Sequence, residues 1–299
     1  MSSLGNVAGA FPAAPARSGV RPDRVRGSLT WIGEQKLSLI IPAFTLLAIV
    51  TASVLAAVIA PYDPNALDMQ QTLAAPSMEH PLGTDQLGRD VLSRILYGGR
   101  TTIVMSLLGT VAIVSIGLLI GLTTGYIGGR FDLVVSTLLT VLLSVPSLLL
   151  TLAILGILGA GTETLLVALI GAGWVGHARI FRSSVLSLRE TVYVEAAQSV
   201  GASNRRILTR HILPNLLTTV VVMATLDLGA LILTVTSLSF LGLGVQPPNA
   251  DWGTMLNEAR TYFGQFPILA IAPGVCITLV ALLCNLLGDA IRDAVDVGQ

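Results

Sequence analysis

The side chains in this sequence that could carry out chemistry are few. Three histidines, His80, His177 and His211, fall outside the middle of the long apolar stretches, and neither H-E-x-x-H nor G-x-S-x-G occurs. Cys276 and Cys284 lie eight residues apart. On a helix this separates them by about 12 Å, too far for a disulfide, so we interpret them as small apolar fillers. We therefore expect no catalytic residue, cofactor-binding residue or metal ligand in this chain.

The most distinctive polar segment is YVEAAQSVGASNRRILTRHILPN, residues 193–215. Paired alanines favour a helix over about 191–200, and Gly201 is the residue best able to adopt the positive φ that ends it. Ser203 is a suitable N-cap for a second short helix, which Pro214 either ends or leads into the next apolar stretch. The sequence predicts a helix, a turn and a helix, which serve either as a handle for another protein or as a plain basic connector.

The elements that must position this segment are membrane-spanning helices. Hydrophobic residues make up 53% of the 299 residues and charged residues 11%, less than half of the charged fraction of an ordinary soluble domain. Crossing a bilayer takes about 20 helical residues. Six stretches qualify, namely 38–60, 101–127, 132–158, 162–181, 215–243 and 267–288. Pro146 and Pro273 lie inside two of them, where we expect kinks.

Basic residues predict the orientation of these spans. With six spans, both termini lie on the same side as the connection 182–214, and 13 of the 17 Lys and Arg residues fall on that side. The positive-inside rule therefore places the termini and residues 193–215 in the cytoplasm. We interpret residues 1–36 as a disordered cytoplasmic tail and residues 37–299 as one transmembrane domain with an external segment at about 61–100.

Two segments are expected on the outer side. Between Thr84 and Tyr97 apolar residues recur at helical spacing, which predicts a short amphipathic helix with Thr84 as its N-cap. Such a helix either rests on the membrane surface, or lines an outer mouth or meets a partner. In the second outer segment, Trp252, Tyr262 and Phe263 lie near span ends, and we interpret them as interfacial anchors.

Several sequence blocks resemble one known family. Glu195-Ala196-Ala197, then Gly201 and a closing Leu213-Pro214, resemble the EAA loop of the permease subunits of ATP-binding-cassette importers. His211 stands where the general pattern has isoleucine, and HILPN is similar to the peptide-importing branch. Further similar blocks are APYDPN, HPLGTDQLGRDVLSRILYGGR, LSVPSLLL, LSFLGLGVQPPNADWGTML and NLLGDAIRDAVD. Over about residues 38–296 the chain resembles the C-type permease subunit of dipeptide, oligopeptide and nickel importers, most of all a dipeptide permease.

The resemblance implies an all-α, type I importer permease with six transmembrane helices in a bacterial inner membrane. It implies as partners a second, different permease subunit, two ATPase subunits that bind ATP and Mg, and an extracytoplasmic substrate-binding protein. It assigns the ATPase contact to Tyr193, Glu195, Ala196, Ala197, Gly201, Ala202, Arg205, Leu213 and Pro214. The sequence has no G-x-x-x-x-G-K-[ST] pattern and its only lysine is Lys36, so the energy must come from another chain. Balanced charge, 17 basic and 17 acidic residues, gives no indication of a nucleic-acid partner.

Asp227 is the one acidic residue well inside a predicted span, where an ionisable group is a functional candidate by default. It either faces the translocation path and meets a peptide amine, or hydrogen-bonds a neighbouring span. The cargo stays open among peptides, nickel complexes and haem-like molecules. A secondary transporter would need several such carboxylates or broken, repeat-related helices. Composition is also compatible with a structural membrane scaffold.

Overall fold

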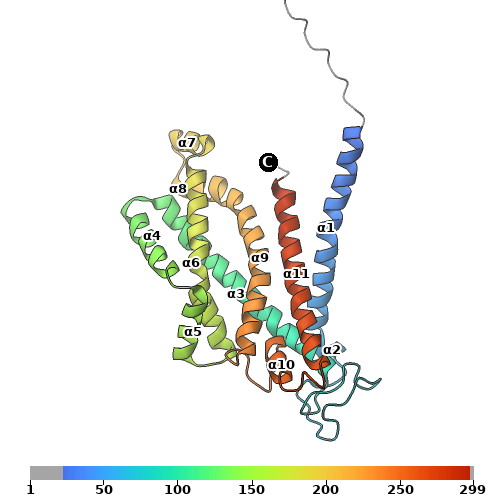
Figure 1. The fold of residues 1–299 in the computed structure, drawn as a ribbon. Coiled ribbons are helices and arrows are strands. Elements are labelled where there is room, and N and C mark those ends of the chain that lie inside the picture. Colours follow the sequence, from blue (N-terminus) through green and yellow to red (C-terminus); the bar gives the residue numbers. More distant parts are fainter. Residues whose placement is uncertain (1–22, 297–299) are drawn as a thin grey trace, which may run out of the picture.

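The computed structural model describes residues 23–296, and within them the chain is built from helices, with one isolated β-bridge between Thr84 and Asp90. In chain order the helices are α1 (Asp23–Val54), α2 (Ala56–Ile59), α3 (Val91–Ile127), α4 (Gly129–Leu143), α5 (Ser147–Leu158), α6 (Thr162–Arg189), α7 (Val192–Ser199), α8 (Asn204–Ile207), the π-helix η1 (Leu208–Ile212), α9 (Leu213–Phe240), α10 (Trp252–Ala259) and α11 (Ile268–Asp296). Figure 1 shows α7 and α8 at one end of the bundle and α2 and α10 at the other.

Four helical segments are long and apolar enough to cross a membrane: α3, α6, the continuous run Asn204–Phe240 that includes α9, and Ile268–Ala294 of α11. Helices α4 and α5 together would make a fifth span, bent by 82°. The apolar part of α1, Leu39–Val54, is shorter than the 18 residues required. Within the described residues the helices therefore supply four or five spans, and the predicted count of six stays a prediction.

Helix α1 extends further toward the N-terminus than the sequence indicated. It begins at Asp23, inside the segment 1–36 that we expected to be a tail, and residues 1–22 of that segment lie outside the described residues. From Asp23 to Ile41 the sequence contains no proline. Nothing in the covalent backbone of this stretch therefore prevents the helix of the apolar segment from continuing.

The kink expected at Pro146 is a complete break between two helices. Helix α4 ends at Leu143, and α5 begins at Ser147, directly after Pro146. Proline lacks an N–H and its ring clashes with the carbonyl four residues earlier, so it interrupts one helix and is suited to starting the next. Helix α11, in contrast, continues through Pro273.

Glycines spaced four residues apart on α3 let this helix lie directly against α6. A Cβ atom added to Gly117 would lie 2.4 Å from Cβ of His177, and one added to Gly121 would lie 2.7 Å from the carbonyl oxygen of Ala178. Gly125 continues the same row toward the C-terminal part of α6. Small residues permit this close approach, which is how helices associate within lipid. Helix α6 is therefore held by α3 along much of its length.

We expect Gly121→Ala to destabilise the protein by about 1–3 kcal/mol, because the added methyl group overlaps backbone atoms that move only if the two helices separate. Gly176→Ala on α6 is the matched control, since nothing lies within 4 Å of a Cβ there. Replacing that helical glycine should stabilise the protein by about 0.5–1 kcal/mol. Thermal unfolding of the purified variants measures both changes, and equal stability of the two variants would contradict the packing.

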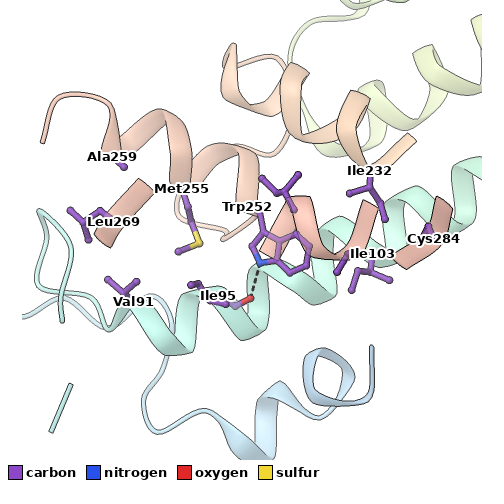
Figure 2. Close-up of a cluster of buried hydrophobic side chains, with 11 residues drawn as sticks. Val91, Ile95, Ile103, Ile232, Trp252, Met255, Ala259, Leu269 and Cys284 are labelled. Atoms are coloured by element: carbon purple, nitrogen blue, oxygen red, sulfur yellow. Dashed lines mark hydrogen bonds between the residues drawn. The ribbon is translucent and has the colours of Figure 1, made fainter. Parts of the chain in front are cut away.

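At the other end of the bundle, α10 closes a hydrophobic cluster. Trp252 is 1% exposed, and its indole Nε1 donates to the carbonyl oxygen of Ile95 at 3.0 Å (Figure 2). The prediction that Trp252 is an interfacial anchor is therefore wrong: an indole whose N–H has a partner can be fully buried. Tyr262 is partly buried against the same cluster, and Phe263 remains 55% exposed.

The residue before Trp252 fixes the start of α10. The carboxylate of Asp251 accepts from the backbone N–H of Gly253 at 2.7 Å and from the hydroxyl of Thr254 at 2.8 Å. Burial raises the pKa of the Asp251 carboxyl, and these hydrogen bonds oppose that rise. An N-cap of this kind satisfies otherwise unpaired N–H groups inside the buried end of the molecule.

The amphipathic helix predicted to start at Thr84 does not form as a separate element. Helix α3 begins at Val91 with Asp90 as its N-cap and continues unbroken into the apolar span. The residues before it form turns, in which the Asp85 carboxylate accepts from the N–H of Leu87 at 2.9 Å. Such side-chain-to-backbone bonds compete with helix formation. Thr84 lies among these turns, and its hydroxyl bonds to the backbone of residues 71 and 74 instead of capping a helix.

Four charged side chains connect these turns to α10. Arg89 Nε donates to Asp85 Oδ2 at 2.6 Å, and the Nη2 atoms of Arg89 and Arg94 donate to the same Glu258 oxygen at 2.8 and 2.9 Å. The two arginine side chains are 2% and 1% exposed. Two positive and two negative groups therefore neutralise one another in a buried position, and they fix the turns before α3 to α10.

Candidate docking site on the loop between α6 and α9

The segment between α6 and α9 has the predicted arrangement of helix, turn and helix. Helix α7 is followed by Gly201 at φ +76°, and the Ser203 hydroxyl caps α8 by accepting from the N–H of Arg206. Nothing lies within 4 Å of a Cβ at Gly201, so the glycine is required by its backbone conformation alone. Pro214 lies in the first turn of α9, so it leads into the span and does not end the second helix.

The π-helix η1 between α8 and α9 was not predicted. It spans Leu208–Ile212, immediately before Leu213 and Pro214. Its backbone carbonyl at His211 accepts from the side-chain amide of Asn215 at 2.6 Å. Proline offers no N–H to a regular α-helical ladder at this point, and single π turns of this type often occur at functional sites.

Helix α7 is anchored to the bundle through one buried side chain. Val194 is fully buried in a cluster with Phe181 and Val185 of α6, Ile207 of α8 and Ile212 of η1. Val194 is the only buried residue of α7. The other side chains of this short helix therefore lie at the edge of the cluster or point outward.

An exposed apolar stripe follows the outward face of α7 and ends at Val200, the C-cap of this helix. Val192 and Val200 are 81% and 84% exposed, and Ala196 is also exposed midway between them at helical spacing. Tyr193 is 44% exposed beside the stripe, and the Glu195 carboxylate lies in the first turn, where it interacts favourably with the helix dipole. An exposed apolar face with polar residues around it makes α7 a candidate interaction site.

The predicted site residues fall into three positions. Tyr193, Glu195 and Ala196 lie on the outward face of α7, and Arg205 and Pro214 are exposed beyond the turn. Ala197 and Ala202 are half-buried against the cluster around Val194, and Leu213 is half-buried at the start of α9. Sequence reasoning missed Val192 and Val200, although their spacing of four residues on either side of Ala196 was available as a signal.

Polar contacts hold this loop to the neighbouring helices. The Tyr126 hydroxyl at the end of α3 donates to the side-chain oxygen of Asn204 at 3.0 Å, and Arg189 Nη1 donates to the Tyr126 carbonyl at 3.2 Å. The rings of Tyr193 and His211 lie 6.3 Å apart. His211 therefore packs within the loop, and among the described residues no group of three or more potential metal ligands occurs.

Helix α6 is longer than the predicted span 162–181 and carries two polar links to other helices. Arg182 binds the carboxylate of Asp132 on α4, with Nη2 donating to Oδ2 at 2.7 Å. His177 Nε2 contacts the Asp227 carboxylate on α9. Because α6 runs from Thr162 to Arg189, His177 lies near the middle of this helix and not at the end of a span that stops at residue 181.

Asp227 contacts a side chain of a neighbouring span, which is one of the two roles that the sequence left open. Its Oδ2 atom contacts His177, which links α9 to α6, while its side chain remains 33% exposed. Within the described residues its second oxygen has no partner. A role for that oxygen in a translocation path stays a prediction.

Comparisons with known proteins agree on one family. The family described as binding-protein-dependent transport system inner membrane component matches residues 117–298. The nickel transport system permease protein NikC of Escherichia coli (strain K12) is 37% identical over 236 residues, covering 79% of this chain and 85% of the relative. The glutathione transport system permease protein GsiD of Pectobacterium atrosepticum is 41% identical over 237 residues, covering 79% of each chain. GsiD of Escherichia coli O6:K15:H31 is 38% identical over 284 residues, covering 93% of each.

A solved structure shares the fold. An inward-facing crystal form of the MetNI methionine ABC transporter superposes with a TM-score of 0.55 at 21% identity, covering 68% of this chain and 96% of that chain. At this identity the likeness concerns the helical fold alone.

Proposed function

The chain belongs to the family of binding-protein-dependent transport system inner membrane components and is a permease of the peptide and nickel class of ATP-binding-cassette importers, and on this premise we propose that it carries di- or oligopeptides and is driven through α7. As a permease it is a non-catalytic subunit, and ATP hydrolysis belongs to partner chains. The observation that supports the proposal most directly is the exposed stripe of Val192, Ala196 and Val200 on α7.

The proposed mechanism transmits force from the ATPases to two helices. A groove on an ATPase subunit receives the apolar stripe of α7, with Glu195 and Tyr193 at its edge. Val194 packs against α6 and against the segment that leads into α9. Displacement of α7 therefore moves the adjoining ends of α6 and α9. Closure of the ATPase pair then switches the permease between inward-open and outward-open arrangements.

The remaining partners follow from the family. We propose that this chain pairs with a second, different permease subunit, that both termini face the cytoplasm, and that a substrate-binding protein delivers cargo to the end that carries α10. The unpartnered oxygen of Asp227 supports a position on the path between the two permeases, where it would meet a cationic group of the cargo.

Peptides are the cargo class that we favour. Glutathione, named for two of the relatives, is itself a short peptide, and the HILPN block is similar to the peptide-importing branch. Nickel complexes are the alternative, because a nickel permease is 37% identical, and haem-like cargo is a further alternative within the same class.

Purification and uptake test the proposal together. The tagged chain, isolated from its native membrane, should bring two ATPase subunits and a second permease with it, and mass spectrometry of the associated binding protein should detect a peptide. Proteoliposomes of this complex should take up labelled dipeptide or glutathione only with ATP. Uptake by the chain without ATPases would favour a secondary transporter, and ATP-dependent uptake of nickel alone would assign the alternative cargo.

A further inference from the structure

The contact between His177 and Asp227 is the only polar one that the structure shows between the described side chains of α6 and α9. On one side of it, Leu165 and Leu169 of α6 pack in one apolar cluster with Val235 and Leu238 of α9. On the other side, α6 and the start of α9 pack in the cluster around Val194. The pair is therefore a single polar link in the middle of an otherwise apolar contact.

The hydrogen-bonding partners of His177 determine how many protons the pair holds. The ring nitrogen Nδ1 lies 3.2 Å from the carbonyl oxygen of Gly173. A carbonyl oxygen only accepts, so Nδ1 must carry a proton and donate it. The other nitrogen, Nε2, faces Oδ2 of Asp227, and a hydrogen bond between two such atoms requires one proton between them.

This count is the same for either position of that proton. The proton resides either on Nε2, giving an imidazolium beside a carboxylate, or on Oδ2, giving a neutral imidazole beside a carboxylic acid. Both forms have the same composition and a net charge of zero. Without this proton, two lone pairs face each other and the pair carries one negative charge in an apolar surrounding, which is costly.

We propose that His177 and Asp227 form a binding site for a single proton, and that this proton fastens α6 to α9 at the middle of the two helices. The contact is present when the site holds its proton and opens as the pH rises and the proton leaves. The fastening does not depend on the proposed cargo or ATPase partners, because it concerns only two helices of this chain.

The other ionisable groups around the pair lie on α6 and on α11. Helix α11 packs against α9 where Gly288 meets Leu226, and it carries Asp289, Arg292 and Asp293 just beyond that contact. Helix α3 packs against His177 through Gly117 and carries no ionisable residue between Thr101 and Gly125. On α9, from Leu213 to Phe240, Asp227 is the only ionisable residue. The next charged residues of α6 are Arg179, which is exposed, and Arg182, which is engaged by Asp132 of α4.

The link joins the two helices that the α7 loop connects. While the proton is bound, α6 and α9 are attached at the loop and again at mid-length. When it leaves, they are attached through apolar contacts alone. The protonation of one site therefore determines how tightly the motion of α6 follows that of α9.

Asp227→Asn keeps the hydrogen bond to His177 but removes the carboxylate that helps to hold the proton. An asparagine amide donates to the Nε2 lone pair while Nδ1 still donates to Gly173, so this variant retains the contact but has no proton to lose. Asp132→Asn is the matched control, because it removes the carboxylate from the other polar link of α6, the one to α4. His177→Gln identifies the NMR signals of His177 by their loss.

The first measurement counts protons in the intact complex in membranes. Solid-state NMR with ¹⁵N-histidine and ¹³C-aspartate is recorded from about pH 5 to 9, the range in which histidines titrate. We expect protonated Nδ1 throughout, and one proton on either Nε2 or the Asp227 carboxyl that is lost as the pH rises. In Asp227→Asn, Nε2 should stay unprotonated. An unprotonated Nδ1, or an unchanged titration of His177 in Asp227→Asn, would overturn the proposal.

The second measurement tests whether the distance between α6 and α9 depends on the proton. Spin labels at Arg179 of α6 and Val221 of α9, in a background with Cys276 and Cys284 replaced by alanine, report the distance distribution between the helices. It should broaden as the pH rises in the wild-type complex and in Asp132→Asn, and stay unchanged in Asp227→Asn. A distribution that does not respond to pH in the wild type, or responds equally in Asp227→Asn, contradicts the proton-dependent link.

Discussion

Gly201→Trp is expected to lower ATP-driven uptake by about tenfold or more while the chain remains in the membrane. Gly201 has φ +76°, where a side chain costs about 1–2 kcal/mol, and an indole there also lies beside the outward face of α7. If the displaced stripe loses about 1.4 kcal/mol of docking free energy, its affinity for the ATPase falls tenfold. The readouts are uptake by proteoliposomes and the amount of ATPase that copurifies.

Gly129→Trp is the control for this substitution. Gly129 has φ +61° and nothing within 4 Å of a Cβ, so a side chain there imposes the same kind of backbone strain at another open position, the first residue of α4. Comparable uptake by the two variants would mean that strain and not docking determines the loss. Normal ATP-dependent uptake by Gly201→Trp would refute the role of the loop.

Glu258→Leu is expected to destabilise the protein by about 3–5 kcal/mol, the cost of leaving a buried charge without its partner. The Glu258 oxygen accepts from both Arg89 and Arg94, and these arginines are almost fully buried. With leucine in its place, two guanidinium groups share the single carboxylate of Asp85. The turns before α3 should then detach from α10, which is detected as a lower unfolding temperature and faster proteolysis within residues 61–90.

Arg260→Leu provides the comparison, because Arg260 is an exposed charge two residues away. It should change the unfolding temperature little, since exposed ion pairs contribute about 0–1 kcal/mol. Glu258→Gln keeps a hydrogen-bond acceptor without the charge and should fall between the two. If Glu258→Leu unfolds at the wild-type temperature, the four charges do not hold the outer end together.

Local signals predicted the loop between α6 and α9 well. Paired alanines, the positive φ of Gly201 and the cap at Ser203 act over a few residues, so the sequence contains all the information that they require. The row of Gly117, Gly121 and Gly125 was equally visible as a four-residue spacing, but its meaning depends on the residues of α6 that it contacts, which lie more than fifty positions further along the chain.

Other features depend on partners that only the fold brings together. Trp252 has the composition of an interfacial anchor, but its burial requires the carbonyl of Ile95, a contact across 157 residues. The helical spacing after Thr84 is real, yet Asp85 closes a turn that competes with the helix. His177 and Asp227 meet across 50 residues, and nothing near either residue in the sequence indicates the other.

The π turn of η1 has a consequence for the orientation of the docking stripe. A π-helical turn contains one residue more than an α-helical turn, and each residue of an α-helix corresponds to a rotation of about 100°. Loss of one residue from 208–212 would therefore rotate α7 by about a quarter of a circle around the axis of α9 and aim its valines at a different side. The direction in which the apolar stripe of α7 faces is thus determined by the length of a five-residue segment, independently of which residues form the stripe.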